Sequence, residues 1–242
     1  MPCQDTIPGG GLLGVVVPTL NEERTILGCL RAVGQVPGVE VVISDGGSSD
    51  GTLTLVRGER SDVRVVTGPP GRGAQLNRGA AAAGGADAFV FVHADCRLPE
   101  GWEGAVRTAL AEAAIAVGCF HLHTEPPAGG GDTAFARWWW RLLDLRSRGL
   151  GLPYGDQALF VPHGVFEAVG GFPEIPLMED MAFVRSCLRH GRLARLPLEV
   201  RTTARRFARH PFRSRLCTAT FPLLFRMGVS PDRLARWYGD AR

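Results

Sequence analysis

Three short polar segments hold most of the residues in this sequence whose types and spacing could do chemistry. They are PTLNEE at residues 18–23, DGGSSDGT at 45–52 and HAD at 93–95. Each follows an apolar run typical of a buried strand. Open α/β sheets bind ligands at the carboxyl ends of their strands, where a carboxylate can hold a cation that bridges phosphates. The three segments therefore predict one ligand site at a sheet edge.

Local structure alone could also explain these segments. Asn21 stands where a helix N-cap is expected, and Glu22 would suit the first turn of that helix. Asp95 could cap the turn before Pro99 instead of binding a hard cation such as Mg²⁺ or Mn²⁺. The second segment is stronger evidence, because glycines such as Gly47 let the backbone approach a ligand closely. It is not the G-x-G-x-x-G pattern of a dinucleotide-binding turn.

The apolar runs that must position these segments alternate with helical patterns. Strands are predicted at 12–17, 39–44, 63–66 and 88–92, and helices at 22–32, 50–57 and 71–85. Such alternation predicts an α/β protein with a Rossmann-like, mostly parallel sheet that has helices on both faces. Farther along we expect strands at 114–123 and 157–161, and helices at 99–111, around Trp138 to Trp140, at 178–190 and over 211–238.

The amino-acid composition excludes two kinds of catalytic or binding site. All 27 basic residues are arginines, which excludes a Schiff-base lysine and a Walker-type phosphate loop. The net charge of +3 hides a basic end, because residues 185–242 hold 14 arginines against Glu199, Asp232 and Asp240. That end suits a phosphate-rich ligand, an anionic membrane surface or nucleic acid, whereas a solvated helical face would need no partner.

The cysteines and the first eleven residues indicate in which cellular compartment the protein is expected. The six cysteines form no C-x-x-C pair, and residues 1–11 lack the basic start and apolar core of a signal peptide. We therefore expect reduced thiols and a cytoplasmic protein. No apolar run reaches the roughly 18 to 20 residues that cross a bilayer. A peripheral contact at the inner face of the membrane, through the basic tail, stays open.

Taken together, the motifs resemble family 2 glycosyltransferases of the GT-A fold. PTLNEE, SDGGSSDGT and HADCRLP occur in the order and rough spacing of that family, and the resemblance extends to about Phe207. It implies one domain over residues 1–242. The nucleotide-sugar-binding half would cover about 12–97, the acceptor half about 98–210, and a basic helical tail 211–242. In that family the first motif lines the nucleotide, the second holds the base, and the third is the D-x-D site for metal and diphosphate.

The resemblance makes Asp45 a contact of the base and Asp95 the metal ligand. His93 departs from the pattern, because it stands where D-x-D has its first Asp. An imidazole can bind ribose, diphosphate or Mn²⁺, but it adds no negative charge at neutral pH. A divalent cation, Mg²⁺ or Mn²⁺, is therefore expected with weakened affinity.

The carboxylates of LMED at 177–180 match the pair that supplies the catalytic base in this family, and GGF at 170–172 matches it as well. An acceptor hydroxyl must lose a proton as it attacks the anomeric carbon, so we expect Asp180 to be the general base and Glu179 a supporting or acceptor-positioning group. Acids at a helix start can also simply complement the helix dipole. GLPYGDQALF at 151–160 and TTARRF at 202–207 resemble the subgroup labelled arsenosugar-biosynthesis or selenium-associated glycosyltransferases.

The expected substrate-binding residues come from these motifs and from GRGAQLN at 71–77, which resembles the family's loop before the fourth strand. They are Pro18, Thr19, Asn21, Glu22, Asp45, Gly47, Arg72, Gln75, Asn77, His93, Ala94, Asp156, Gln157, Arg205 and Arg206. The arginines would bind phosphate through their planar guanidinium groups, although each could equally be a surface residue. Asp156 and Gln157 would hold sugar hydroxyls.

Three further features have plainer explanations. Trp138, Trp139 and Trp140 cannot all face one way on a helix, so at least one should be in the core. His121 and His123 share a strand face and could chelate a metal, but a packed or exposed face is the commoner outcome. Cys96 has no cysteine partner nearby in the sequence and is expected to pack.

The resemblance thus predicts an inverting transfer of a sugar from a nucleotide-diphospho-sugar, UDP-linked, to an unknown small-molecule or lipid-linked acceptor. A homodimer is compatible with it, and no nucleic-acid partner is expected. One rival is a nucleotidyltransferase, which usually needs a Gly-rich basic loop near the N-terminus that PTLNEE is not. A second is a non-catalytic nucleotide-sugar-binding protein. A third, a membrane-surface module built on 211–238, can coexist with the first.

Overall fold

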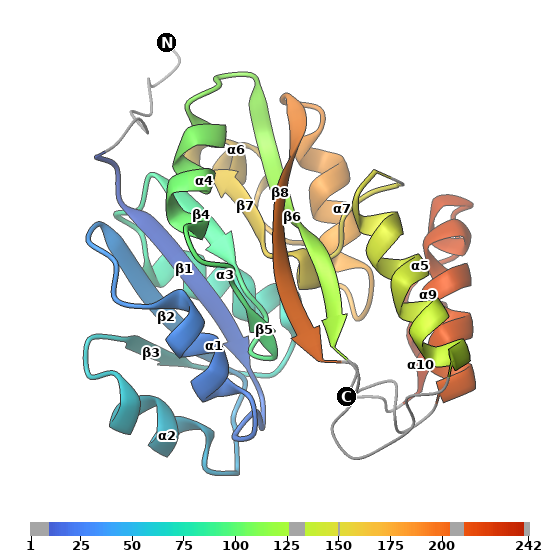
Figure 1. Cartoon of the computed structure of the whole chain (residues 1–242), viewed down its shortest axis with the longest axis horizontal. Helices are drawn as coiled ribbons and strands as arrows, with labels where there is room; N and C mark the ends of the chain where they lie inside the picture. Colours follow the sequence, from blue (N-terminus) through green and yellow to red (C-terminus); the bar gives the residue numbers. More distant parts are fainter. Residues whose placement is uncertain (1–9, 126–133, 150, 204–210, 240–242) are drawn as a thin grey trace.

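Short runs of valine, isoleucine and phenylalanine form the first strands, and helices alternate with them as predicted (Figure 1). The computed structural model describes residues 10–125, 134–149, 151–203 and 211–239, and only the backbone of 134–137, 143 and 211–215. The first half contains β1 (Leu13–Thr19), α1 (Ile26–Val33), β2 (Val39–Asp45), α2 (Thr52–Glu59), β3 (Arg64–Thr67), α3 (Arg72–Ala82) and β4 (Ala88–Phe91).

The second half is less regular. In chain order it contains β5 (Cys96–Arg97), α4 (Trp102–Leu110), β6 (Ile115–Glu125), α5 (Ala134–Ser147), the 3-10 turn η1 (Gly155–Gln157), β7 (Leu159–Pro162), α6 (His163–Val169), α7 (Glu179–Cys187), β8 (Arg192–Thr203), α9 (Pro211–Arg226) and α10 (Pro231–Tyr238). All described strands join one sheet, in the order β3-β2-β1-β4-β7-β6-β8-β5.

Parallel pairing dominates the sheet. The pairs β1–β2, β1–β4, β2–β3 and β6–β8 are parallel, whereas β7 runs antiparallel to β4 and β6, and β5 antiparallel to β8. The predicted fold class, a mostly parallel α/β sheet with helices on both faces, is confirmed. The strand order also brings the carboxyl ends of β1, β2, β4, β6 and β8 toward the lower edge in Figure 1.

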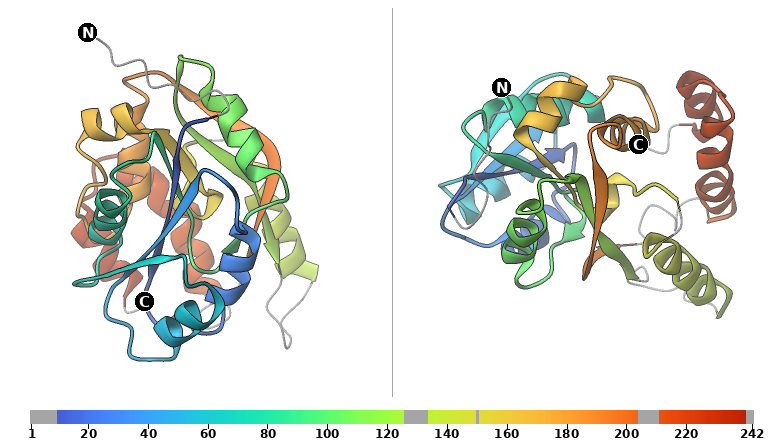
Figure 2. Two further views of the ribbon diagram at one scale, coloured as in Figure 1. Left: turned by 90° about the vertical axis from the view of Figure 1, so that its left-hand side faces the viewer. Right: turned by 90° about the horizontal axis from the view of Figure 1, so that it is seen from above.

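Side chains of one strand alternate between two apolar layers, one on each face of the sheet. From β1, Val15 and Val17 enter the layer covered by α1, α2 and α4, and Val16 enters the layer covered by α3, α6 and α7. A third, smaller cluster joins α9 and α10 through Phe221 and Leu234. The helices α5, α9 and α10 lie at the end of the molecule away from β3 (Figure 2).

The structure corrects several boundaries. Asn21 is not the N-cap of the first helix, because its backbone is left-handed (φ 55°) and the cap is Thr25. The predicted strand at 157–161 begins only at Leu159, after η1. The tail holds two helices instead of one, because Gly228 (φ 91°) follows the end of α9 and Ser230 caps α10 by accepting from the Arg233 N–H. β5, α6 and β8 were not predicted.

Among the described residues, no helix is both long enough and apolar enough to cross a membrane.

Candidate active site

A pocket of ≈ 200 Å³ lies where the carboxyl edge of the sheet meets the C-terminal helices. Its lining comes from the turn after β4, from β6 and β8, from η1, from the start of α7, and from α9 and α10. The lining residues are Arg72, His93, Asp95, Leu122, Thr124, Arg146, Tyr154, Asp156, Leu177, Met178, Glu179, Asp180, Thr202, Thr203, Cys217, Thr218, Phe221, Pro222 and Tyr238.

The turn after β4 brings three potential metal ligands together. The Cys96 N–H donates to the His93 carbonyl at 2.9 Å, which folds the chain into a tight turn. One ligand atom each from His93, Asp95 and Cys96 lies within 4.8 Å of the others, and all three residues are buried. This is the one such cluster of at least three candidate ligands within the described part of the chain.

The chemistry of this cluster suits a cation that takes oxygen and nitrogen ligands. Burial, followed by the charges of Asp95 and Asp156, raises the pKa of the Cys96 thiol well above its usual value. Without a cation the thiol therefore stays protonated, and a hard cation prefers the oxygen and nitrogen ligands beside it. The Asp95 carboxylate and the His93 imidazole remain, and they fit a divalent cation that completes its shell with ligand phosphate oxygens.

Two carboxylates begin α7. Met178 caps the helix in a left-handed conformation (φ 68°), so that Glu179 and Asp180 occupy its first turn, both buried. Asp180 accepts hydrogen bonds from the backbone N–H groups of Gly155 (2.8 Å) and Met181 (2.7 Å). Burial, and then the nearby charge of Glu179, raises the pKa of Asp180 to about 7 against these hydrogen bonds. A carboxylate with that pKa is suited to general-base catalysis near neutral pH.

An ion pair joins α3 to this helix. The Arg72 guanidinium lies 3.2 Å from the Glu179 carboxylate, whose side chain is 3% exposed. Arg72 starts α3 and keeps 36% of its side chain exposed. It can therefore neutralise Glu179 and still face a phosphate in the pocket.

Gly155 allows His93 and Asp180 to approach each other. A Cβ at this position would lie 2.6 Å from His93 Nε2 and 3.5 Å from Asp180 Oδ2. A larger residue would displace the His93 ring, so the close approach of this ring, and not backbone strain, favours glycine here.

A second polar cluster, outside the pocket, lies at the ends of β1 and β2. Asp45 accepts from Thr19 Oγ1, from the Ser48 hydroxyl and N–H, and from the Gly47 N–H. Burial by itself would raise the pKa of Asp45, but these hydrogen bonds outweigh it and hold the pKa below its ordinary value. Asn21 Oδ1 accepts from the Ser49 N–H at 2.9 Å and so ties the first loop to the second. Asp45 thus stays ionised and shapes the loop.

Three of the predicted substrate-binding residues have side-chain amides that already make hydrogen bonds inside the protein. Gln75 donates to the carbonyls of Thr19 and Ser44. Asn77 exchanges two hydrogen bonds with the backbone of Phe172, and Gln157 donates to the Phe120 carbonyl. The residues at 75, 77 and 157 therefore brace loops around the site in this structure.

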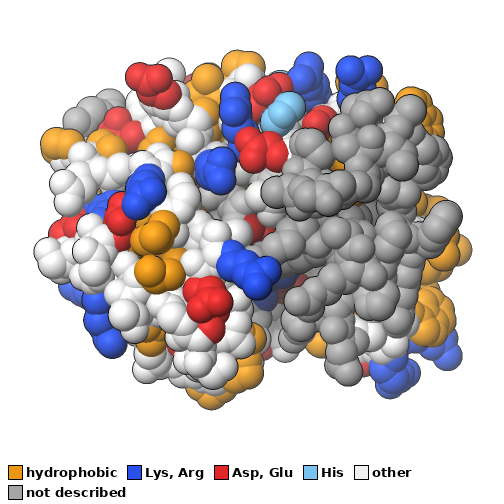
Figure 3. All heavy atoms as spheres, turned by 60° about the horizontal axis from the view of Figure 1, so that its bottom comes forward, with side chains coloured by type: hydrophobic (Ala, Val, Ile, Leu, Met, Phe, Trp, Pro, Cys, Tyr) orange, Lys and Arg blue, Asp and Glu red, His pale blue; other side chains and the backbone are white. Residues whose placement is uncertain are grey.

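The pocket brings together six of the predicted site residues: Arg72, His93, Asp95, Asp156, Glu179 and Asp180. It is not lined by Pro18, Thr19, Asn21, Glu22, Asp45, Gly47, Gln75, Asn77, Ala94 or Gln157. Arg205 and Arg206 lie outside the described residues. Figure 3 looks toward this edge of the sheet; on its left-hand side, basic and acidic side chains are mixed and form no broad basic patch among the described atoms.

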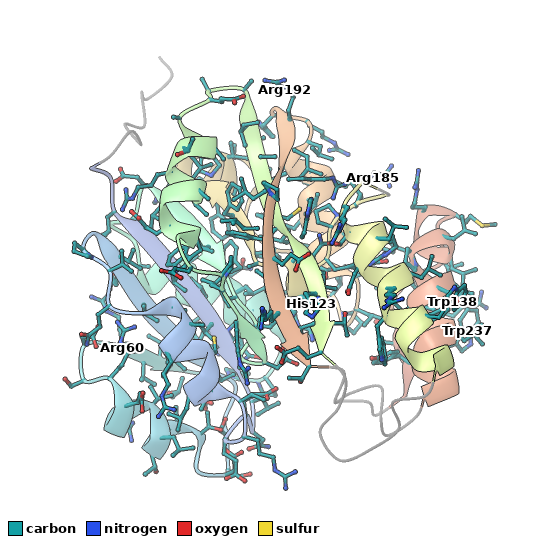
Figure 4. All side chains as sticks on the ribbon, viewed as in Figure 1. Arg60, His123, Trp138, Arg185, Arg192 and Trp237 are labelled. Atoms are coloured by element: carbon teal, nitrogen blue, oxygen red, sulfur yellow. The ribbon has the colours of Figure 1, made fainter. Side chains whose placement is uncertain are left out.

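Several lining residues were missed, although some signals were present. Tyr154, Thr202 and Thr203 belong to the motifs YGDQ and TTARRF, of which only other members were predicted to bind substrate. On β6 the pocket is lined by Leu122 and Thr124, whereas His123 on the opposite face is 48% exposed (Figure 4). Nothing in the sequence indicated that α9 and α10 would reach the pocket.

The packing expectations for the remaining features hold. Cys96 is fully buried. Trp140 is 5% exposed and Trp138 is 56% exposed, so the three tryptophans of α5 do face different ways.

The chain resembles known proteins both in sequence and in fold. The model of Glycosyl transferase family 2 matches residues 14–159, which is more than half of the chain. No curated protein matches the sequence.

Solved structures share the fold. The mannosyltransferase PcManGT from Pyrobaculum calidifontis, in complex with GDP-Man and Mn²⁺, is 20% identical with a TM-score of 0.65, over 96% of this chain and 69% of that one. S. aureus TarS is 17% identical with a TM-score of 0.60, over 92% and 41%. GalNAc-T7 with UDP, GalNAc and Mn²⁺ is 15% identical with a TM-score of 0.62, over 81% and 44%. This chain thus spans less than half the length of TarS and of GalNAc-T7.

Proposed function

The chain belongs to glycosyl transferase family 2, and we propose that it transfers a sugar from a nucleotide-diphospho-sugar to an acceptor hydroxyl with inversion. The observation that carries the proposal is the shared pocket of Asp95 and Asp180, one at the end of a sheet strand and the other at the start of a helix. A diphosphate site and a basic carboxylate must face one reaction space for this chemistry.

The proposed reaction is a single displacement. The acceptor oxygen attacks the anomeric carbon while the bond from that carbon to the diphosphate oxygen breaks. Asp180 takes the proton of the acceptor hydroxyl, and the nucleoside diphosphate leaves with the electron pair of the broken bond. Arg72 faces the growing negative charge of the leaving group, and Glu179 holds Arg72 in place through their 3.2 Å ion pair.

We propose that Asp95, helped by His93, holds a divalent cation, Mg²⁺ or Mn²⁺. When bound, the cation supplies positive charge that neutralises the diphosphate. Support comes from the clustered ligand atoms and from the presence of Mn²⁺ in the PcManGT and GalNAc-T7 structures. Imidazole in place of a carboxylate favours Mn²⁺ over Mg²⁺.

The donor is proposed to occupy the half around residues 12–97, with a uracil base near the loop that Asp45 shapes. The residues proposed to line the nucleotide are Pro18, Thr19, Asn21, Glu22, Asp45 and Gly47. UDP is present in the GalNAc-T7 structure and GDP-Man in that of PcManGT. A comparison of UDP with GDP binding therefore tests the proposed uracil site directly. Arg205 and Arg206 are proposed as further contacts of the leaving diphosphate, and residues 98–210 as the acceptor half.

The tail, residues 211–242, is proposed to touch the inner face of an anionic membrane from the cytoplasm. Leu216 on α9 is 64% exposed, and Met227, directly after α9, is 72% exposed. Exposed Arg226 and Arg236 accompany them, and Trp237 lies at the same end of the molecule (Figure 4). Apolar side chains among arginines are typical of helices that lie on anionic membranes. Liposome flotation at low salt tests this contact, and size-exclusion chromatography tests the alternative that a second copy covers the same end.

One experiment tests the central proposal. Thermal shift is measured with UDP, GDP and their sugar conjugates, with and without Mn²⁺, for the wild type, Asp95→Ala and Asp180→Asn. We expect a Mn²⁺-dependent shift with UDP that Asp95→Ala loses and Asp180→Asn keeps, and donor turnover that both variants lose. Near-normal turnover by Asp180→Asn would remove the base assignment. Pyrophosphate release from a nucleoside triphosphate and a sugar phosphate would instead identify a nucleotidyltransferase, and binding without any turnover a non-catalytic protein.

A further inference from the structure

The acceptor side of the pocket is built largely from apolar side chains. Leu122 comes from β6, Leu177 and Met178 precede α7, Phe221 and Pro222 belong to α9, and Tyr238 ends α10. A pocket for a polyhydroxylated sugar would carry groups that pair with several hydroxyls, because each unpaired buried polar group costs free energy. The apolar surface indicates a different kind of acceptor.

The apolar wall has a fixed relation to the base. In the cluster that holds α9 to α10, Phe221 and Leu234 pack with Leu177 and Met178. Met178 is the cap residue directly before Glu179 and Asp180. The apolar part of an acceptor that packs on Phe221 would therefore lie at a fixed distance from the Asp180 carboxylate, the proposed general base.

Two buried hydroxyl groups in the same lining have few partners. Among the described residues, Thr203 Oγ1 makes no hydrogen bond, and Tyr154 Oη has only the Arg146 guanidinium as a neighbouring donor. The Arg146 guanidinium lies over the Tyr154 ring, 4.1 Å from its centre, and holds the ring in place. Buried polar atoms without partners are rare in folded proteins, and in a pocket they indicate groups that a ligand satisfies.

We propose that the acceptor is an alcohol whose reacting hydroxyl is carried by an apolar body, either an aromatic ring or an alkyl chain. The body lies against Phe221, Pro222 and Tyr238, the hydroxyl reaches Asp180, and Tyr154 positions the polar end of the acceptor. A cavity of about 150 Å³ is enough to hold benzene, and the whole pocket of ≈ 200 Å³ must also admit part of the donor, so its acceptor side admits at most one ring or a short chain at a time. This inference rests on the proposed glycosyl transfer.

A series of simple alcohols tests the acceptor class. Transfer from the donor is measured with methanol, 1-butanol, 1-hexanol and benzyl alcohol, and with glycerol as a polar probe, while release of free sugar reports the reaction with water. Each methylene that enters the pocket should raise kcat/KM about fourfold, from the usual gain of about 0.8 kcal/mol per buried methylene. Glycerol should be no better than methanol.

Variants connect that preference to this wall. Phe221→Ser should flatten the rise of kcat/KM along the alkyl series, and Phe221→Leu should keep most of it if the serine variant folds poorly. Leu223→Ser, at a 61% exposed position of the same helix, is the matched control and should keep the full rise. Tyr154→Phe should raise KM for the alcohols with little change in kcat.

The outcomes separate the two proposals. If the protein binds and hydrolyses the donor but kcat/KM does not depend on chain length, or is highest for glycerol, the apolar acceptor is wrong and the proposed transferase stands. The same holds if Phe221→Ser and Leu223→Ser behave alike. If the donor neither binds nor reacts, the proposed function fails and this inference fails with it.

Discussion

The backbone N–H of Gly155 donates a 2.8 Å hydrogen bond to Asp180, and His93 packs against the same glycine on the side where a Cβ would stand. One residue without a side chain thus connects the proposed metal cluster to the proposed base. Because Gly155 is buried between them, we expect it to be sensitive to substitution, which gives the first prediction.

Gly155→Ala should lower kcat/KM for transfer by about 100-fold, the usual cost of moving a catalytic group by about 1 Å. The new Cβ would lie 2.6 Å from His93 Nε2, so the imidazole or the turn must move. Steady-state transfer and the Mn²⁺ concentration for half-maximal activity are the measurements. Gly149→Ala is the control, since a Cβ there meets nothing within 4 Å. Equal activity of the two variants would contradict the proposed role of Gly155.

Activity should depend on pH through Asp180. Because the pKa of this carboxyl is raised to about 7 and only its ionised form accepts a proton, kcat/KM should rise with pH, reach half its maximum near pH 7 and level off above it. Asp180→Asn should lose roughly 10²- to 10⁴-fold in turnover together with this limb of the profile. A flat profile between pH 5 and 9 in the wild type would argue against Asp180 as the base.

Two neighbours should shift that midpoint in opposite directions. The Arg72 charge lowers the pKa of Asp180, so Arg72→Met should move the midpoint upward. The Glu179 charge raises the pKa of Asp180, so Glu179→Gln should move it downward. Arg72→Met should also destabilise the fold by about 1 kcal/mol, because it leaves Glu179 buried without its partner while Arg72 itself is partly exposed. Shifts of the same sign would refute this electrostatic account.

Mn²⁺ affinity should follow the number of carboxylates in the turn after β4. His93→Asp adds a negative charge to the cluster and should tighten Mn²⁺ binding, whereas Asp95→Ala should weaken it by at least the roughly 10- to 100-fold that changes around a ligand cost. Cys96→Ser is the control and should leave the affinity unchanged, because a protonated thiol is not a ligand. Calorimetry with UDP present measures all three, and a large loss in Cys96→Ser would make the thiol a ligand after all.

Strands and site residues were predicted most accurately where a run of apolar residues ends in a polar turn. β1, β2 and β4 were found from their valine-rich runs, and the polar turns after β1 and β2 meet at one cluster of hydrogen bonds. The carboxylates at 95 and 180 were placed in one site by resemblance, and the pocket contains both. Local patterns suffice here because parallel strands bring their ends to one edge.

Prediction failed where tertiary structure overrides local pattern. β8 reads as a mixture of arginine and leucine with Pro197 inside, which argues against a strand. The structure accommodates the proline at an irregularity, where the β6–β8 register jumps from Phe120–Leu196 to His121–Glu199. The pocket wall on α9 and α10 depends on long-range packing, and no local signal in the sequence encodes it.

The strand order has a consequence for how the site forms during folding. β4 and β5 are separated by only four residues of chain, yet β7, β6 and β8 lie between them in the sheet. β5 is held by β8, through the pairing of Cys96 with Thr202, more than a hundred residues later in the chain. Bringing such distant segments together is entropically costly and slow. During synthesis, the turn at 93–95 therefore lacks its pairing with β8 until residue 202 has been added, so we expect the proposed metal site to form late in folding.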